Sequence, residues 1–223
     1  MIELGAPIVG LAQVEEAIVV VTRSNLRFAP VAAGRLGPWT QEPVDGPISM
    51  DAHGGLVAVA SQPGVSIYDH QLAVLHTVNE PAASVAVQDQ RVWMARADEV
   101  VVLQRKNEKW AVGSHLPVHI EQLATAGRTV FGLDARQRVL LLGRSVTDTG
   151  IHAGHLTRLG SQVAAIVDDS VVVLGPNAQV LALYAAPLFL LYGVEVPGGA
   201  INVQNNSGTL TLYDRYETTP VLQ

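Results

Sequence analysis

The stretch Leu56–Asp69, LVAVASQPGVSIYD, contains two short runs of alternating residues on either side of a turn signal. Valine alternates with alanine in residues 57–60, and Val and Ile alternate with Ser and Tyr in residues 65–68. The intervening segment Ser61–Gly64 contains the dipeptide Pro-Gly. Because a period of two is typical of a half-buried strand and Pro-Gly is typical of a turn, the stretch predicts a β-hairpin.

Relatives of this hairpin occur along the whole chain at a nearly fixed period. The apolar strand that begins at Val57 has counterparts that begin at Ile18, Val92, Val130, Val171 and Leu210. Successive separations are 39, 35, 38, 41 and 39 residues, so the repeat is about 38 residues long. Each unit has a small-residue strand, this apolar strand, a third strand and a more variable fourth segment, separated by short turns. Four strands in a unit of about forty residues are the signature of a β-propeller.

We therefore expect an all-β fold, a single six-bladed β-propeller domain spanning residues 1–223 with four strands in each blade. The blades are expected at residues 8–47, 48–82, 83–119, 120–160, 161–197 and 198–223. The last repeat lacks a fourth strand, so Met1–Gly5 is expected to supply it and close the ring, which would remove an open sheet edge. An unpaired N-terminal tail is the alternative. The segment His119–Ala126 could form two helical turns, but its place in the repeat favours a strand.

The repeat resembles those of WD-repeat, Kelch and quinoprotein-type propellers over essentially the full chain. The signature motifs of these families do not carry over: the chain has no Trp-Asp pair, and its three tryptophans do not share one position of the repeat. The doublets Gly54-Gly55 and Gly198-Gly199 also stand at non-equivalent positions. The resemblance therefore implies the superfold and no specific family, and a superfold does not determine a function.

The composition of the chain indicates a continuous core and bears on the cellular location of the protein. Hydrophobic residues make up 48% of the chain, which is enough for a continuous core, and charged residues make up only 15%. Cysteine is absent, which excludes disulfides and thiolate metal sites. The N-terminus has no basic region typical of a secretory signal, and the apolar run Val180–Val196 is too short and contains Pro187. We expect a cytoplasmic protein without membrane insertion.

The formal net charge of −6 argues against a general nucleic-acid binder, but the charge is unevenly distributed. Residues 91–144 contain nine Lys or Arg and five Asp or Glu, a balance of +4. This region could form a surface for anions or an acidic partner, and a solvated face of two adjacent repeats is the simpler alternative. The candidate residues are Arg91, Arg96, Arg105, Arg128, Arg136, Arg138 and Arg144.

The sequence contains no phosphate-binding loop, dinucleotide fingerprint or Gly-x-Ser-x-Gly motif, so we predict no catalytic residues and no cofactor. No metal site is predicted either. The weak candidates for one are His152 and His155, three residues apart, and the adjacent acids Asp168 and Asp169. These residues fall in connections between strands, where imidazoles are commonly exposed and carboxylates commonly bind backbone N–H groups.

The segment Leu188–Tyr192, LFLLY, is apolar or aromatic at five consecutive positions. If it is the outer strand of the fifth repeat, it forms an exposed apolar edge of the kind that marks a protein interface. The expected interface residues are Tyr184, Leu188, Phe189, Leu190, Leu191 and Tyr192. The alternatives are that long connections cover this strand or that the repeat is locally misaligned.

These observations favour a non-enzymatic protein–protein interaction scaffold, a subunit or adaptor of a larger intracellular complex. One alternative is a propeller-type hydrolase, a lactonase, or a binder of a small ligand or metal, using Asp51, His53, Asp89 or Asp168 near the ends of the inner strands. A second alternative is a nucleic-acid-associated scaffold that uses the arginines of the third and fourth blades. The identity of the partner does not follow from the sequence.

Overall fold

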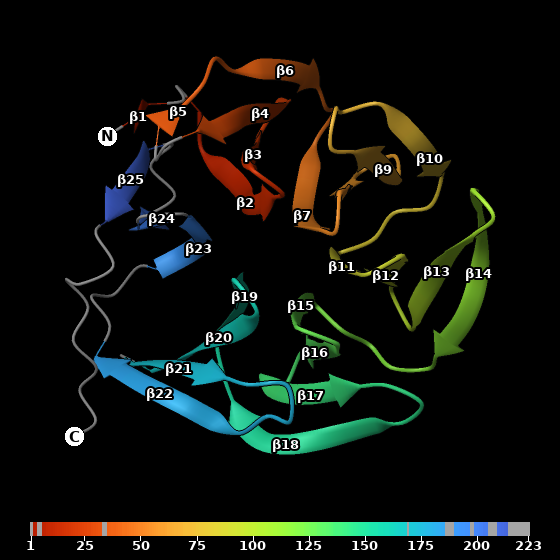
Figure 1. Cartoon of the computed structure of the whole chain (residues 1–223). Coiled ribbons are helices and arrows are strands. Elements are labelled where there is room, and N and C mark those ends of the chain that lie inside the picture. The colour runs from red at the N-terminus through yellow and green to blue at the C-terminus, as the bar shows by residue number, and fades with distance from the viewer. Residues whose placement is uncertain are drawn as a thin grey trace.

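Antiparallel sheets stand side by side around a central axis, and each runs outward from an inner strand (Figure 1). This computed structural model describes residues 2–3, 6–32, 35–168, 170–185, 190–196, 199–204 and 209–213, with the side chains of 6–32, 36–168 and 170–183. Within these ranges all regular secondary structure is β-strand. In the described part of the chain, no helix has the length and apolar character needed to cross a membrane.

The sheets follow one another along the chain. The first contains β2 (Ile8–Val14), β3 (Ala17–Thr22), β4 (Asn25–Ala32), β5 (Arg35–Leu36) and β6 (Thr40–Pro43). The second contains β7 (Pro47–His53), β8 (Leu56–Ser61), β9 (Val65–Asp69) and β10 (Val74–Val78). The third contains β11 (Ser84–Gln88), β12 (Arg91–Ala95), β13 (Val100–Lys106) and β14 (Lys109–Leu116).

The remaining sheets repeat this order. The fourth contains β15 (Gln122–Ala126), β16 (Thr129–Leu133), β17 (Arg138–Leu142) and β18 (Val146–His152). The fifth contains β19 (His155–Leu159), β20 (Gln162–Val167), β21 (Ser170–Leu174) and β22 (Val180–Ala185). The last contains β23 (Leu190–Val196), β24 (Gly199–Gln204), β25 (Thr209–Tyr213) and β1 (Ile2–Glu3).

The prediction of six four-stranded blades is wrong, because only five of these sheets have four strands and the first has five. Residues 35–40 lie in the variable fourth segment of the first repeat, and they are divided between two strands that both pair with β4. The end of β4 pairs with β5, and its beginning pairs with β6. Pro38 lies between β5 and β6, and a proline has no N–H to continue a ladder.

In the last two sheets the strands are displaced by one position from the prediction. The strand that begins at Val171 was expected as the second strand of its repeat, but Val171 belongs to β21, the third strand of the fifth sheet, and the inner strand is β19. The segment 188–192 was expected as an outer strand, but β23 is the inner strand of the last sheet and contacts β2 and β19. The strand β19, HLTRL, contains His and Arg, so it lacks the apolar signal that identified the other strands.

The N-terminus supplies the outer strand of the last sheet. Ile2 pairs with Leu210, and Glu3 pairs with Thr209. The predicted pairing of the N-terminal segment is therefore confirmed for these two residues. Because β1 belongs to the sheet that follows β22 around the ring, this pairing joins the two ends of the chain's fold and covers the outer edge of β25.

The core consists of apolar layers between neighbouring sheets. One layer joins the first and second sheets, and others join the second to the third, the third to the fourth and the fourth to the fifth. All six residues of β3 and of β8 are buried, because each of these strands has a neighbouring sheet on both faces. This explains why the Val and Ala run of the opening hairpin, LVAVAS, has no polar face.

Candidate functional site

The inner strands line a central channel, and side chains of one inner strand bind the backbone of the next. In each bond a backbone N–H donates to a side-chain oxygen. The pairs are Val85 to Ser49 Oγ at 3.3 Å, Leu123 to Ser84 Oγ at 2.9 Å and Leu156 to Gln122 Oε1 at 2.8 Å. Inner strands have one edge without a strand neighbour, so these bonds satisfy N–H groups that would otherwise be unpaired.

Arg158 on β19 reaches across the channel to β7. Its Nη1 donates to the carbonyl oxygen of Ala52 at 3.0 Å and lies 3.5 Å from Oδ1 of Asp51. Its Nη2 donates to Nδ1 of His53 at 2.7 Å, and its Nε donates to the carbonyl oxygen of Gly160 at 3.0 Å. Each guanidinium nitrogen thus has a partner in the protein, and the side chain connects β19 to β7 across the channel.

Asp51 is the buried anion of this network, with 6% of the residue exposed. Its Oδ2 accepts a hydrogen bond from the backbone N–H of Val87 on β11 at 2.7 Å, while Oδ1 faces Arg158. The carboxylate therefore links the second, third and fifth sheets. A buried charge of this kind requires a partner and satisfied hydrogen bonds, and both are present.

His53 is the titratable group of the network. Because a guanidinium can only donate, Nδ1 of His53 must accept, which places the proton of the neutral imidazole on Nε2. This Nε2 lies 3.9 Å from Oδ1 of Asp89. Burial and then the positive charge of Arg158 lower the pKa of His53 below 6.5, against the opposing effects of Asp51 and Asp89. The neutral imidazole is therefore part of the native network.

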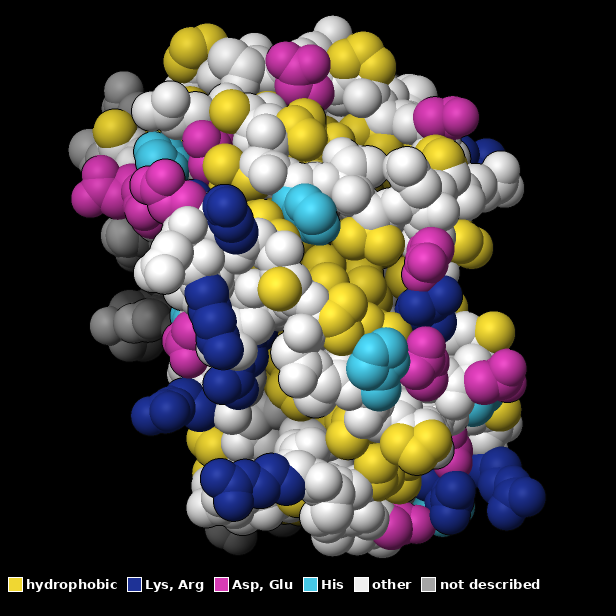
Figure 2. Space-filling model, turned by 90° about the vertical axis from the view of Figure 1, so that its right-hand side faces the viewer, with side chains coloured by type: hydrophobic (Ala, Val, Ile, Leu, Met, Phe, Trp, Pro, Cys, Tyr) yellow, Lys and Arg dark blue, Asp and Glu magenta, His cyan; other side chains and the backbone are white. Residues whose placement is uncertain are grey.

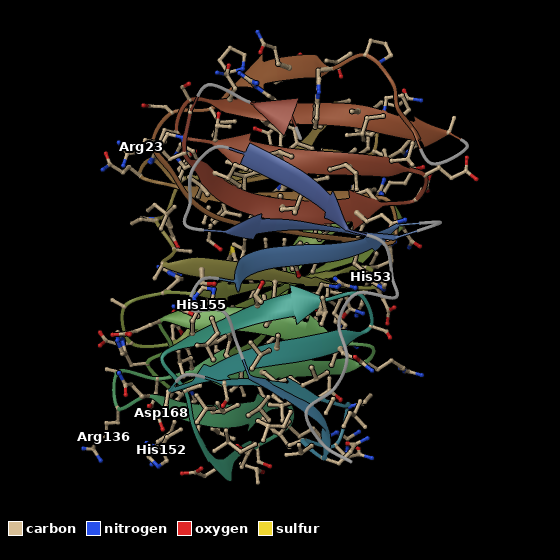
Figure 3. The ribbon with its side chains drawn as sticks, turned by 90° about the vertical axis from the view of Figure 1, so that its left-hand side faces the viewer. Arg23, His53, Arg136, His152, His155 and Asp168 are labelled. Carbon is tan, nitrogen blue, oxygen red and sulfur yellow. The ribbon has the colours of Figure 1, made fainter. Side chains whose placement is uncertain are left out.

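Arg158 lies between two hollows of the channel. One has a volume of about 230 Å³ and the other about 420 Å³, and Arg158 lines both. Polar side chains of the smaller hollow include Ser49, Ser84, Gln122 and His155, and those of the larger include Gln13, His53 and Ser161. Figure 3 shows His53 and His155 toward opposite ends of the molecule, in agreement with this division.

Among the described residues, no group of three or more His, Asp or Glu side chains could hold a metal ion. His152 ends β18, His155 begins β19 and Asp168 follows β20 with a positive φ of 49°. Asp169 lies outside the described residues. Of the residues considered for ligand chemistry, the structure brings Asp51, His53 and Asp89 together. Asp168 is separate from them, in the turn between β20 and β21 of the fifth sheet.

The candidate basic residues divide between the two ends of the ring. We name as the first-turn face the end that carries the turns between the first and second strands, residues 15–16, 54–55, 89–90, 127–128 and 160–161. The strand registers place the end of β13 beside the start of β12 and the end of β17 beside the start of β16. The basic side chains on the first-turn face are Arg91, Arg105, Lys106, Lys109, Arg128 and Arg144, and those on the opposite face are Arg96, Arg136 and Arg138.

Two of the arginines on the opposite face are neutralised. Arg96 pairs with Glu80 at 2.6 Å and with Glu99 at 3.5 Å. Arg138 binds Asp134 through Nε at 2.9 Å and Nη2 at 2.7 Å. Burial acts to raise the pKa of Asp134, but hydrogen bonds from Arg138 outweigh it, and the pKa lies below its ordinary value. By contrast, none of the six basic side chains of the first-turn face forms an ion pair with a described carboxylate.

The apolar interface predicted around Leu188–Tyr192 falls outside the described side chains. Tyr184 belongs to β22, and Leu190, Leu191 and Tyr192 belong to β23; only the backbones of these four residues are described. Leu188 and Phe189 lie outside the described residues. The premise of an outer strand is wrong, since β23 is an inner strand, and the interface itself stays a prediction.

The sequence matches no family model and no curated protein. Solved structures do match it in fold. The structure of U3-55K aligns with a TM-score of 0.66 and 14% identity over 94% of this chain and 78% of that chain. The Cps50 (Swd1) β-propeller domain of Myceliophteria thermophila aligns with a TM-score of 0.61 and 7% identity over 94% of this chain and 98% of that domain. The fold is a β-propeller.

The propeller also aligns with PorZ, a surface component of the type-IX secretion system of Porphyromonas gingivalis. That alignment has a TM-score of 0.62 and 10% identity and covers 99% of this chain, which spans only 39% of the length of PorZ. Identities this low show the propeller fold alone. The site residues of the propeller must therefore be argued from its own chemistry.

The side chain that organises the propeller's channel, Arg158, was missed from the sequence. Its strand carries no apolar signal, because three of the five residues of HLTRL are polar or charged. Ser49, Ser84 and Gln122 were also missed, because nothing within their own strands, PISMDAH, SVAVQ and QLATA, relates one inner strand to the next. Their shared role follows only from the proximity of inner strands around the axis.

Proposed function

We propose that this propeller is a non-enzymatic protein-binding subunit whose first-turn face, over the third and fourth sheets, binds an acidic surface of a protein partner. The observation that carries the proposal is the segregation of charge between the two faces. Within residues 91–144, the first-turn face has six basic side chains and one acidic side chain, a balance of +5. The opposite face has three basic and four acidic side chains, a balance of −1.

The basic side chains of the first-turn face lack described ion pairs and most of them are exposed, which leaves them available to bind another protein. Arg91, Arg128 and Arg144 are exposed at strand ends and have no described ion pair. Arginines enriched at interface centres form bidentate hydrogen bonds with carboxylates, and a cluster of them steers an acidic partner toward the face. Figure 2, which views the side that carries the third sheet, shows a row of basic side chains along the left edge and further basic side chains at the right edge.

A protein partner is favoured over nucleic acid because the same face also carries acidic groups. Glu15 and Glu16 form the first turn of the first sheet, and Asp89 and Glu108 are exposed in turns of the third sheet. A long polyanion that crossed the face would meet these carboxylates, whereas a protein surface of limited size would not. The overall charge of −6 disfavours nucleic acid for the same reason.

The function of a complex subunit has a parallel in PorZ, which is a component of a secretion system. The channel supports a non-enzymatic function, since the polar side chains that it brings together, Arg158, Asp51 and His53, interact with one another. The cytoplasmic location expected from the sequence stays a prediction.

Charge reversal at matched positions tests the proposal. The variant Arg128→Glu/Arg144→Glu alters the first-turn face, and Arg23→Glu/Arg136→Glu alters two exposed arginines in turns of the opposite face, where Figure 3 labels them. Both variants change the net charge equally. The protein should capture a partner from nuclease-treated host lysate, and the purified partner should bind the first variant at least about ten-fold more weakly than the second at low salt.

Two results would contradict the proposal. One is equal affinity of the partner for both variants, which would remove the first-turn face from the interaction. The other is that no protein is captured, while a labelled RNA or DNA duplex of about 20 base pairs binds the parent protein in a salt-sensitive way and does not bind the first variant. The second result would favour the nucleic-acid-associated scaffold.

A further inference from the structure

The outer parts of the second and third sheets face each other across the rim of the ring. Residues opposite each other in an antiparallel pair share a face of the sheet. Leu103, which belongs to the apolar layer between these sheets, is opposite Val112, and Arg105 is opposite Trp110. Val112, Trp110 and Arg105 therefore face the second sheet, from positions near its outer strand β10.

The surface between these strands is apolar and incompletely covered. The ring of His76 on β10 stacks on the ring of Trp110 on β14, with centroids 6.1 Å apart and an interplanar angle of 18°. Leu75, Val78 and Trp110 are only partly buried against the core layer, and Val112 is 56% exposed. Figure 2, which views the side that carries β10 and β14, shows apolar side chains gathered in a shallow hollow. We name this surface the rim groove; its residues are Leu75, His76, Val78, Trp110 and Val112.

The two ends of the rim groove differ in charge. At the first-turn end stands Arg105, which has no ion pair with a described carboxylate. At the other end one cation, Arg96, lies between two carboxylates, those of Glu80 and Glu99, and Glu99 also binds His115 at 2.7 Å. Among the described residues at these two ends, the cation without an ion pair, Arg105, therefore lies at the first-turn end and is continuous with the basic first-turn face, whereas carboxylates outnumber Arg96 at the other end.

The outer edge of β14 is open along the groove. In the described chain β14 pairs only with β13, and it is eight residues long. Its residues 110–114, WAVGS, include no charge and no proline, although such residues commonly protect exposed edges. A bulge at Gly113 interrupts its register with β13, so the regular stretch of this edge runs from Lys109 to Val112. An edge of this kind can pair with an extended segment of another chain.

We propose that the rim groove binds an extended segment of the acidic protein partner. The backbone of the segment runs along β14, an apolar side chain covers Val112 and Trp110, and a carboxylate of the same segment reaches Arg105. This inference rests on the proposed function, since it specifies how the partner of the first-turn face continues onto the rim. The unpaired positive charge at one end and the excess of carboxylates at the other set the polarity of the segment, with its acidic residue at the first-turn end.

Site-specific photo-cross-linking in the full chain tests this inference. The photo-reactive residue p-benzoylphenylalanine replaces Val112 in one variant and Val180 in the other. Val180 is a matched control, because it is an outer-strand valine of the fifth sheet with 55% exposure. In host cells, we expect a cross-link to a protein at position 112 with a yield at least about ten-fold above that at position 180. The cross-linked peptide should contain Asp or Glu close to the cross-linked residue.

Charge reversal then tests the carboxylate contact. Adding Arg105→Glu should lower the cross-link yield at position 112 by about ten-fold, whereas adding Arg136→Glu, on the opposite face, should leave it unchanged. Equal yields at positions 112 and 180 would overturn the inference, as would a cross-link to a nucleic acid or to a second copy of this chain. If no cross-link forms at position 112 but Arg128→Glu/Arg144→Glu still loses its partner, the proposed function stands and the rim groove is excluded. A melting temperature equal to that of the parent protein shows that each variant is folded.

Discussion

Nη1 of Arg158 lies 3.5 Å from Oδ1 of Asp51, although the two residues belong to the fifth and second sheets. The side chains are 17% and 8% exposed, so the pair is shielded from solvent inside the channel. The strands β19 and β7 are not neighbours in the ring, and Arg158 therefore joins sheets that share no apolar layer. The channel of this propeller is held by a polar cross-link in addition to the layers between its sheets.

Removal of the cation should destabilise the fold strongly. In Arg158→Met, the apolar stem remains but Asp51 keeps a buried negative charge with no cation beside it. We expect the free energy of unfolding to fall by about 3–5 kcal/mol, measured by urea denaturation. Arg136→Met, at an exposed turn, should change it by less than about 0.5 kcal/mol.

A double variant tests whether the uncompensated charge of Asp51 causes this loss of stability. Adding Asp51→Asn to Arg158→Met removes the uncompensated charge and keeps an oxygen for the N–H of Val87. The double variant should therefore be more stable than Arg158→Met alone. A double variant that is less stable by the full cost of Asp51→Asn would show that Arg158 stabilises the channel by packing and not through this charge.

His53 should make stability depend on pH. Its pKa in the folded protein is below 6.5, so the unfolded chain takes up this proton first as the pH falls. The stability contributed by the neutral imidazole is fully present above 6.5 and is lost as the pH falls toward the folded pKa. The free energy of unfolding should decrease as the pH falls below 6.5, and His53→Gln should flatten this slope.

His70→Gln is the control for that experiment, because His70 is exposed in a turn and has no part in the channel. Its slope should equal that of the parent protein. Asp134, whose folded pKa lies below 3.8, acts in the same direction but only at lower pH, so the two effects are separated. An unchanged slope in His53→Gln would contradict the assigned network.

The hydrogen bonds between inner strands should contribute individually. In Ser84→Ala the N–H of Leu123, a residue with 7% exposure, loses the oxygen that accepts its hydrogen bond at 2.9 Å. We expect a loss of about 1–3 kcal/mol in the free energy of unfolding and faster hydrogen exchange at the Leu123 amide. Ser114→Ala on the exposed strand β14 should leave both quantities unchanged, and equal effects of the two substitutions would contradict the assignment.

The sequence predicted those features that each repeat carries by itself. The alternation in LVAVAS and its relatives marks strands buried on both faces, so the repeated hairpin and the all-β class could be predicted. The strands β19 and β23 could not, because HLTRL and LLYGVEV depart from the shared pattern. The fifth strand of the first sheet was missed because a single segment, 35–40, is divided by Pro38.

The candidate site was harder to predict because its residues meet only through the ring. Arg158 is separated from His53 by 105 positions, and no local pattern relates them. The basic residues were recognised as a group, but their chain order mixes two faces. Arg91 and Arg128 lie at first turns while Arg96 and Arg136 lie in second turns, so the segregation of charge appears only when strand direction is known.

The opening hairpin provides the last prediction, at Gly64 in the turn between β8 and β9. Its φ of +154° and its position leave no room for a side chain, since an added Cβ would lie 2.0 Å from the carbonyl oxygen of Val78 on β10. Gly64→Ala should therefore displace β10 or the turn and lower the free energy of unfolding by about 3 kcal/mol. Gly154→Ala is the matched control, because an added Cβ there has nothing within 4 Å, and it should be neutral to within about 0.5 kcal/mol. Equal stability of the two variants, measured by urea denaturation, would contradict the close packing of the turn against β10.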